Sequence, residues 1–99
     1  MSYEFLPEAR EELVAATLYY ESKEAGLGVR FQDEISHIIR RILADPYLWR
    51  ERSAGYRRVN CPVFPYHLAY FIRGEKIVIA AVAHGHRKPD YWKTRLHGD

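Results

Sequence analysis

Residues 77–92 read IVIAAVAHGHRKPDYW, and this stretch decides the fold that the sequence predicts. It begins as a run of small and branched apolar residues with no Lys, Arg, Asp or Glu before Arg87. It then passes, within a few positions, into histidine, arginine, lysine, tyrosine and tryptophan. Apolar residues at both alternating sets of positions are typical of a strand that is buried on both faces. We therefore predict a central strand over 76–84 whose end presents polar and cationic side chains.

Two shorter runs with the two-residue period of a strand precede the central strand. They cover 56–61 and 64–72, and a turn that contains Gly74 joins the second run to the central strand. We therefore predict an antiparallel meander of three strands. In the middle strand one alternating set is apolar and is expected to pack on helices: Phe64, Tyr66, Leu68, Tyr70 and Ile72. The other set is partly apolar and is expected to face solvent or a partner: His67, Ala69, Phe71 and Arg73.

The first half of the chain predicts two helices. Pro7 fits the first turn of a helix, and helical spacing continues to Gly26, which suits the left-handed end of a helix. A second helix is expected to begin at Gly28 or just after it and to end at Asp45-Pro46. Its apolar stripe has three- and four-residue spacing: Phe31, Ile35, Ile38, Ile39, Ile42 and Leu43. The short joint between the helices makes them an antiparallel hairpin.

Two short segments complete the predicted order of elements. Residues 2–6 alternate like a brief edge strand, and Pro89 opens a short C-terminal helical turn that reaches Arg95. The order is then β-α-α-β-β-β, an α+β fold in which a helical hairpin packs on a small antiparallel sheet. A chain of 99 residues is expected to form one domain over 1–99.

The composition restricts the cellular setting. No apolar run approaches the roughly 20 residues that span a bilayer, so no membrane partner is expected. The first twelve residues carry acids and no apolar signal core, which predicts no export signal. Cys61 is the single cysteine, as is usual in a reducing compartment. We therefore expect a cytoplasmic protein.

Charge divides the chain into two unlike halves. Residues 1–49 hold nine acids and five bases, whereas residues 50–99 hold four acids and ten bases, for a net charge of +2. Eleven of the fifteen basic residues are arginine, whose planar fork suits bidentate contact with phosphate or carboxylate. The second half is therefore expected to present a cationic surface to an anionic partner. A solvated basic face without a partner would show the same asymmetry.

Several side chains that can carry chemistry are expected to meet near the end of the central strand. Arg57 and Arg58 are neighbours on the first meander strand and so point to opposite faces. His67 lies on the neighbouring strand, and strands that follow one another in sequence usually lie side by side. The remaining candidates leave the central strand or follow one turn later: His84, His86, Arg87, Lys88, Tyr91 and Trp92.

These residue types fit phosphodiester cleavage without a metal. Such cleavage needs a base for the 2′-hydroxyl, an acid for the leaving oxygen and cations that offset charge at phosphorus. The alternative is structural: His84 bonds to backbone at the strand end, and Tyr91 and Trp92 cap the core. A zinc site of His84, His86 and Cys61 is a further possibility, although no CxxC or helical HxxxH accompanies it. We expect neither a metal nor another cofactor.

Three segments resemble the RelE/ParE superfamily, the small toxins of bacterial type II toxin–antitoxin modules: 55–59 (GYRRV), 64–70 (FPYHLAY) and 82–87 (VAHGHR). The two predicted helices match as well, so the resemblance covers nearly the whole chain. It implies a toxin that a cognate antitoxin neutralises, in a hetero-oligomer. The H-G-x-R ending is closer to the ParE-like branch, often labelled plasmid stabilisation proteins, whose members inhibit DNA gyrase and are not known as nucleases.

The RelE-like branch cuts mRNA on the ribosome, and it usually has lysines on the first meander strand and an arginine where His67 stands. If this chain were RelE-like it would be an endoribonuclease, and the resemblance would imply a catalytic set of Arg58, His67, His84, Arg87 and Tyr91. If it is ParE-like it is not an enzyme. The expected target- or antitoxin-binding residues are Arg57, Arg58, His86, Arg87, Lys88, Tyr91 and Trp92. A non-toxic binding module is the third alternative.

Overall fold

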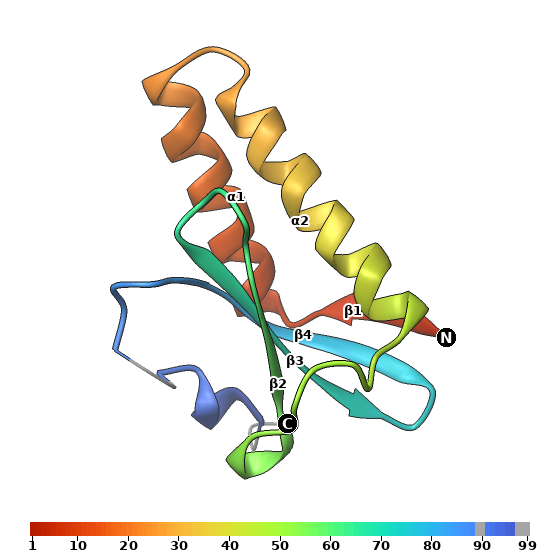
Figure 1. The fold of residues 1–99 in the computed structure, drawn as a ribbon. Helices are drawn as coiled ribbons and strands as arrows, with labels where there is room; N and C mark the ends of the chain where they lie inside the picture. The colour runs from red at the N-terminus through yellow and green to blue at the C-terminus, as the bar shows by residue number, and fades with distance from the viewer. Residues whose placement is uncertain (89–90, 97–99) are drawn as a thin grey trace.

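The computed structural model describes residues 1–88 and 91–96. Two helices form the predicted hairpin, α1 (Pro7–Lys23) and α2 (Leu27–Ala44). The remaining elements are four strands and two 3-10 turns: β1 (Ser2–Phe5), β2 (Arg57–Asn60), β3 (Tyr66–Arg73), β4 (Lys76–His84), η1 (Ser53–Gly55) and η2 (Lys93–Leu96). Figure 1 shows the hairpin on one face of the sheet, which confirms the α+β prediction. The expected start of the last turn, at Pro89, lies outside the described residues.

The sheet has the strand order β1-β4-β3-β2, so β4 is a central strand as predicted. The three meander strands are antiparallel, but β1 pairs with β4 in parallel, from Ser2 opposite Lys76 to Phe5 opposite Ile79. The sheet is therefore mixed, where the sequence pattern predicted an antiparallel one. Alternation marks Ser2–Phe5 as a strand, but it does not encode the direction of the neighbour beside which that strand lies.

A β-bulge in β4 interrupts the alternation that the sequence suggested. Ala69 lies opposite Ala81 and Tyr70 lies opposite Ile79, so Ala80 has no partner on β3. The extra residue shifts the phase of the strand. As a result Val82, rather than Ala81, joins the core beneath the helices, while the small alanines pack on the opposite face.

The α1–α2 joint is tight because both helices approach each other at a glycine. Gly26 precedes α2 and has a φ of 88°, in the left-handed region that favours glycine. The helix begins at Leu27, one residue before the predicted start at Gly28. Gly28 is buried against α1, where the Glu21 carboxylate accepts hydrogen bonds from the N–H groups of Gly26 at 2.9 Å and Gly28 at 3.0 Å. This contact ties the start of α2 to α1.

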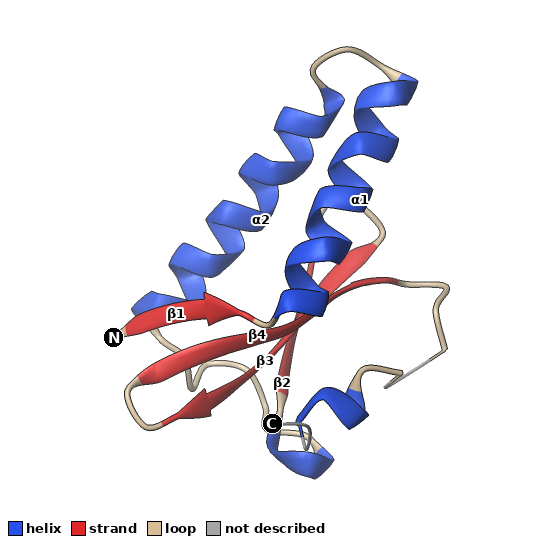
Figure 2. Cartoon of the chain, turned by 180° about the vertical axis from the view of Figure 1, so that it is seen from behind, coloured by secondary structure: helices blue, strands red, loops and turns tan. Residues whose placement is uncertain are grey.

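The second face of the sheet was expected to face solvent or a partner, and this prediction is only partly right: His67 and Phe71 are half-buried and Arg73 is exposed, but Ala69 is buried. Trp92 is 1% exposed, and its ring lies 4.3 Å from the ring of Tyr56 in an edge-to-face contact. Both rings pack on alanines from the two central strands: Ala69, Ala80, Ala81 and Ala83. Figure 2 shows the C-terminal segment on the side of the sheet away from the helices. The bulge and the small alanines make room for a large indole ring there.

Beyond Phe5, no strand among the described residues covers the β1 side of β4, and an ion pair takes the place of one. Glu12 on α1 accepts a hydrogen bond from the Val82 N–H at 3.0 Å. Arg95 donates to the Ala80 carbonyl at 3.0 Å and pairs with Glu12 at 2.9 Å. Both side chains are largely buried, at 15% exposed for Arg95 and 17% for Glu12. We call this pair the edge clamp. Its side chains bond the Val82 N–H and the Ala80 carbonyl, which no strand of the described residues pairs, and so connect β4 to α1 and to the C-terminal segment.

Replacing Gly28 by alanine tests the tight joint. The new Cβ would lie 2.7 Å from the Thr17 carbonyl oxygen, closer than real Cβ contacts, so we expect a loss of about 1–3 kcal/mol in the free energy of unfolding. Gly85→Ala is the control, since its nearest neighbour is the Pro65 carbonyl oxygen at 3.5 Å. Urea unfolding measures both variants. Helix propensity alone favours alanine at position 28, so a stabilised Gly28→Ala variant would contradict the close approach.

Acid titration tests the edge clamp. Burial alone would raise the pKa of Glu12, but hydrogen bonds from Arg95, Tyr91 and Val82 lower it below the ordinary 4.5. The ionised carboxylate therefore stabilises the fold above that pH, and the contribution is lost as pH falls through the lowered pKa. We expect Glu12→Gln to cost about 1.5–3 kcal/mol near neutral pH.

The same measurement has an internal control. The stability difference between wild type and Glu12→Gln should shrink as the pH falls below 4.5, while Glu11→Gln, at an exposed position of the same helix, should differ little from wild type at any pH. A difference of constant size from neutral to acid pH would show that Glu12 does not act through its charge.

Candidate functional site

A shallow pocket forms where β4 ends, and most of the predicted residues line it. We call the following set the basic edge: Arg58, His67, His84, Arg87, Lys88 and Tyr91. Register explains the meeting of the strand residues, because Arg58 lies opposite Ala69, and His67 lies opposite Ala83 on the same face of the sheet. The segment after β4 then folds back over this face and brings Arg87 and Tyr91 to it.

The structure separates the two adjacent arginines of β2. Arg57 faces the opposite side, where it donates to the Trp49 carbonyl at 2.7 Å and approaches Glu51 at 3.4 Å. Its side chain is only 14% exposed. Arg58 remains on the basic edge, with Nε 3.1 Å from the Asn60 side-chain oxygen. Arg57 therefore ties down the loop before η1, and only Arg58 shares a surface with the other candidates.

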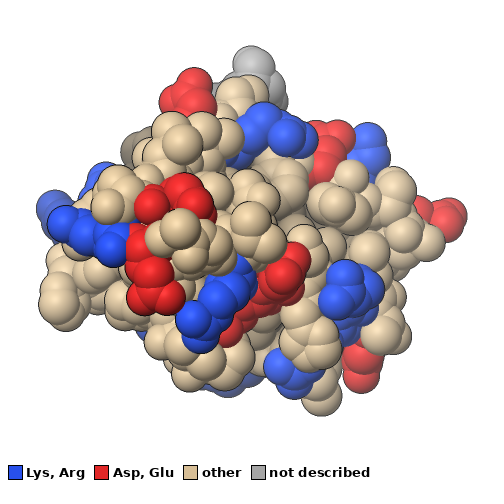
Figure 3. Space-filling view, turned by 90° about the horizontal axis from the view of Figure 1, so that it is seen from above, with Lys and Arg blue, Asp and Glu red and all other residues tan. Residues whose placement is uncertain are grey.

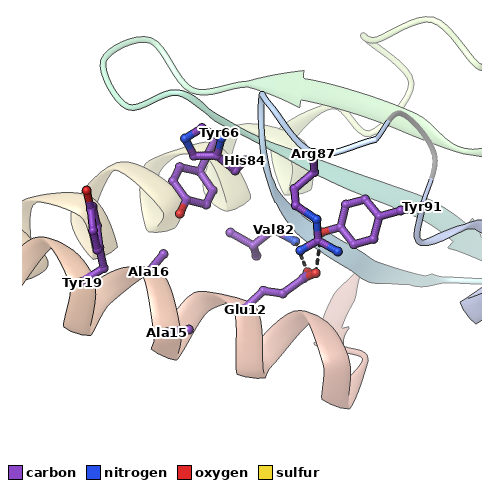
Figure 4. A pocket seen from close by; sticks show the side chains of 9 residues that line it. All are labelled: Glu12, Ala15, Ala16, Tyr19, Tyr66, Val82, His84, Arg87 and Tyr91. Atoms are coloured by element: carbon purple, nitrogen blue, oxygen red, sulfur yellow. Dashed lines mark hydrogen bonds between the residues drawn. The ribbon is translucent and has the colours of Figure 1, made fainter.

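A larger cavity of about 280 Å³ adjoins the basic edge on the helix side of the sheet (Figure 4). Its walls come from α1, the sheet and the segment after β4: Glu12, Ala15, Ala16, Tyr19, Tyr66, Val82, His84, Arg87 and Tyr91. His84 and Arg87 line both hollows, so the two are continuous along one rim. The cavity offers a small apolar floor with hydroxyl, imidazole and guanidinium groups around it.

Arg87 is held against an aromatic ring at the centre of this rim. Its guanidinium carbon lies 3.8 Å from the centroid of the Tyr91 ring, within the range of a cation–π contact. The Tyr91 hydroxyl donates a short hydrogen bond to Glu12, and Figure 4 shows the two side chains pointing toward each other. The arginine, which is exposed, therefore rests on a ring that the edge clamp anchors.

This anchoring decides what Tyr91 can do chemically. Burial, followed by the hydrogen bond to Glu12 and the charge of Glu12, raises the pKa of Tyr91 to about 12, against the opposing charges of Arg87 and Arg95. At neutral pH the phenol is protonated, and its proton is directed at the Glu12 carboxylate. Tyr91 therefore lacks the free phenolate that a general base requires.

The histidines and the cysteine do not assemble a metal site. His84 Nδ1 accepts a hydrogen bond from the His86 N–H at 3.0 Å, and the two rings lie 4.9 Å apart. Within residues 1–88 and 91–96, no three His, Cys, Asp or Glu side chains lie close enough to hold a metal ion. Burial, then the charge and hydrogen bond of Glu34, raises the pKa of the Cys61 thiol to about 12, so that thiol stays protonated.

Two other candidate site residues, His86 and Trp92, differ in their exposure to solvent. His86 is exposed beside His84, whereas Trp92 is buried in the second face and contributes packing there.

Figure 3 shows the molecule from the hairpin end, where basic and acidic side chains are interspersed. The charge asymmetry of the sequence therefore produces no continuous basic patch on that face.

Sequence reasoning missed three residues of the site. Glu12 fits the first turns of α1 as one of several acids that favour a helix N-terminus, and nothing in its spacing indicates a partner 79 positions later. Tyr19 and Tyr66 also line the cavity, but Tyr66 was assigned to the core and Tyr19 sits on a helix whose apolar residues are spread around it. Local sequence patterns give no signal for these three residues, because they join the site through tertiary contacts between segments that are distant in sequence.

Comparison with known proteins agrees with this arrangement of elements. A solved structure described as a chromosomal ParDE TA system from P. aeruginosa is similar, with a TM-score of 0.63 and 17% sequence identity. The match covers 85% of this chain and 95% of that one. At this identity the likeness shows the fold. A search of the curated proteins gives no significant match. In the described residues, no helix is long and apolar enough to cross a membrane.

The family follows from the sequence itself. A family model described as the ParE toxin of the type II toxin–antitoxin system parDE matches residues 3–89, which span both helices and all of the sheet except Ser2. The matched region includes most of the basic edge and Glu12. The chain therefore belongs to the ParE toxin family of type II toxin–antitoxin systems.

Proposed function

We propose that this toxin acts in the cytoplasm by binding and inhibiting DNA gyrase, and that a cognate antitoxin neutralises it. Membership of the ParE toxin family supports this reading over mRNA cleavage, because the ParE-like branch is the one that the resemblance associates with gyrase. The observation that carries the choice is the state of Tyr91. Its hydroxyl donates to the Glu12 carboxylate and is therefore bonded within the chain, whereas an acid–base residue would offer its hydroxyl to a substrate.

The basic edge supplies the contacts of the proposed complex. Arg58, Arg87 and Lys88 bring three cations to one pocket rim, with His67 and His84 between them. Clustered cations steer an acidic partner to the surface, and arginine can grip a carboxylate through two parallel hydrogen bonds. His86 extends the same rim, since its ring touches that of His84.

The antitoxin is proposed to use the cavity beside α1. That cavity is open, has an apolar floor and shares Arg87 with the basic edge. An antitoxin segment seated there would cover Arg87 and so compete directly with the target. The segment needs small apolar side chains for the floor and an acidic group for the rim.

Two assays separate gyrase inhibition from mRNA cleavage. Purified protein is added to a gyrase supercoiling reaction and, separately, to a translating extract whose mRNA ends are mapped. We expect loss of supercoiling and no new mRNA ends. Cleavage at codon boundaries with intact supercoiling would assign the chain to the RelE-like activity, and silence in both assays would favour a binding module without toxicity.

Removing Arg87 tests the basic edge in cells. Arg87→Ala deletes a guanidinium that lies at the junction of both hollows, so we expect induced growth arrest to be weakened at least roughly tenfold in the expression level it requires. Arg30→Ala, an exposed arginine on α2, is the charge-matched control and should arrest growth like wild type. Equal toxicity of all three proteins would place the target surface elsewhere.

A further inference from the structure

Glu12 binds three residues from one position on α1, one in β4 and two in the C-terminal segment. Its oxygens accept hydrogen bonds from the Val82 N–H at 3.0 Å, from Arg95 at 2.9 and 3.1 Å, and from the Tyr91 hydroxyl. The first two contacts form the edge clamp. The third ends on Oε2, which also accepts the 2.9 Å bond from Arg95, and both Glu12 and Tyr91 line the cavity (Figure 4).

The Tyr91 contact leads directly to the exposed arginine of the rim. Arg87 stacks on the Tyr91 ring at 3.8 Å, and Arg95 approaches the same ring at 5.2 Å. A free arginine side chain samples many rotamers, and ordering it on binding weakens affinity. A guanidinium that already lies on a fixed ring presents its donors in one plane before the partner arrives.

We infer that Glu12 is a positioning residue for the basic edge: it anchors the Tyr91 hydroxyl, and the anchored ring holds the Arg87 guanidinium in place for a carboxylate of the target. The inference rests on the proposed function, in which Arg87 contacts that target. Glu12 itself need not touch the partner, because its effect passes through Tyr91.

One substitution distinguishes the proposed role of Glu12 in positioning Arg87 from its role in the edge clamp. Tyr91→Phe removes the hydroxyl but keeps the ring, and it leaves the bonds of Glu12 to Val82 and Arg95 in place. The edge clamp and the fold should therefore survive, while the ring loses its anchor. Tyr47→Phe is the matched control, because Tyr47 also carries an arginine, Arg57, at 5.2 Å from its ring, whereas the hydrogen bonds of Glu12 go to Val82, Tyr91 and Arg95.

The first readout needs no target. Stacking on an aromatic ring shifts the NMR resonances of the Arg87 δ protons upfield, so they report the position of the guanidinium directly. We expect Tyr91→Phe and Glu12→Gln to move these resonances toward unstacked values, with the amide spectrum otherwise that of a folded protein. Tyr47→Phe should leave them unchanged. Arg87 resonances that stay at their wild-type positions in Tyr91→Phe would overturn the inference.

The second readout is growth arrest, which does not depend on the identity of the target. Tyr91→Phe should require roughly two- to tenfold more expression for arrest than wild type. Because the effect passes through Arg87, adding Tyr91→Phe to Arg87→Ala should weaken arrest no further. A full additional loss in that background would overturn positioning and leave the proposed function standing. A wild-type protein that causes no arrest would instead overturn the proposed function, and the functional role of Glu12 with it.

Discussion

The structure depends on one ion pair, Glu12–Arg95, which lies beside the part of β4 that has no neighbouring strand on that side among the described residues. β1 covers only the first half of β4, and the Glu12–Arg95 pair satisfies the Val82 N–H and the Ala80 carbonyl beyond it. Unpaired backbone groups there would invite another strand or cost free energy on burial. The pair also binds α1 on one face of the sheet to the segment that packs Trp92 on the other. The pair thus connects the helices, the sheet and the C-terminal segment.

Much of the fold follows from local patterns in the sequence. The α2 stripe, the positions of Pro7 and Gly26, and the apolar run of β4 each predict the observed element, and β4 has the predicted bounds. The direction of β1 and the bulge at Ala80 do not follow, because both are properties of strand pairing. The sequence also left Trp92 with two readings, a site residue or a cap on the core, and only tertiary contacts could settle that it is buried.

The same distinction applies to the candidate site. Strand pairing in sequence order was enough to expect one of the two β2 arginines near His67 and Arg87, and Arg58 lines one pocket with them. The choice between Arg57 and Arg58 required the actual register. Glu12 was invisible to sequence reasoning, although it accepts a hydrogen bond from the Tyr91 hydroxyl and adds to the rise in the pKa of Tyr91 that burial causes. The residue types alone would also suit a nuclease site, and the tertiary contacts add that the Tyr91 hydroxyl is bonded within the chain.

Amide hydrogen exchange at Val82 tests the central role of the edge clamp most directly. In the wild-type protein the Val82 N–H faces the side of β4 on which no strand of the described residues pairs beyond Ile79, and Glu12 is its hydrogen-bond acceptor. If the clamp closes this edge, the amide exchanges as slowly as those bonded between β3 and β4. Exchange at the rate of a solvent-exposed edge amide would contradict the account.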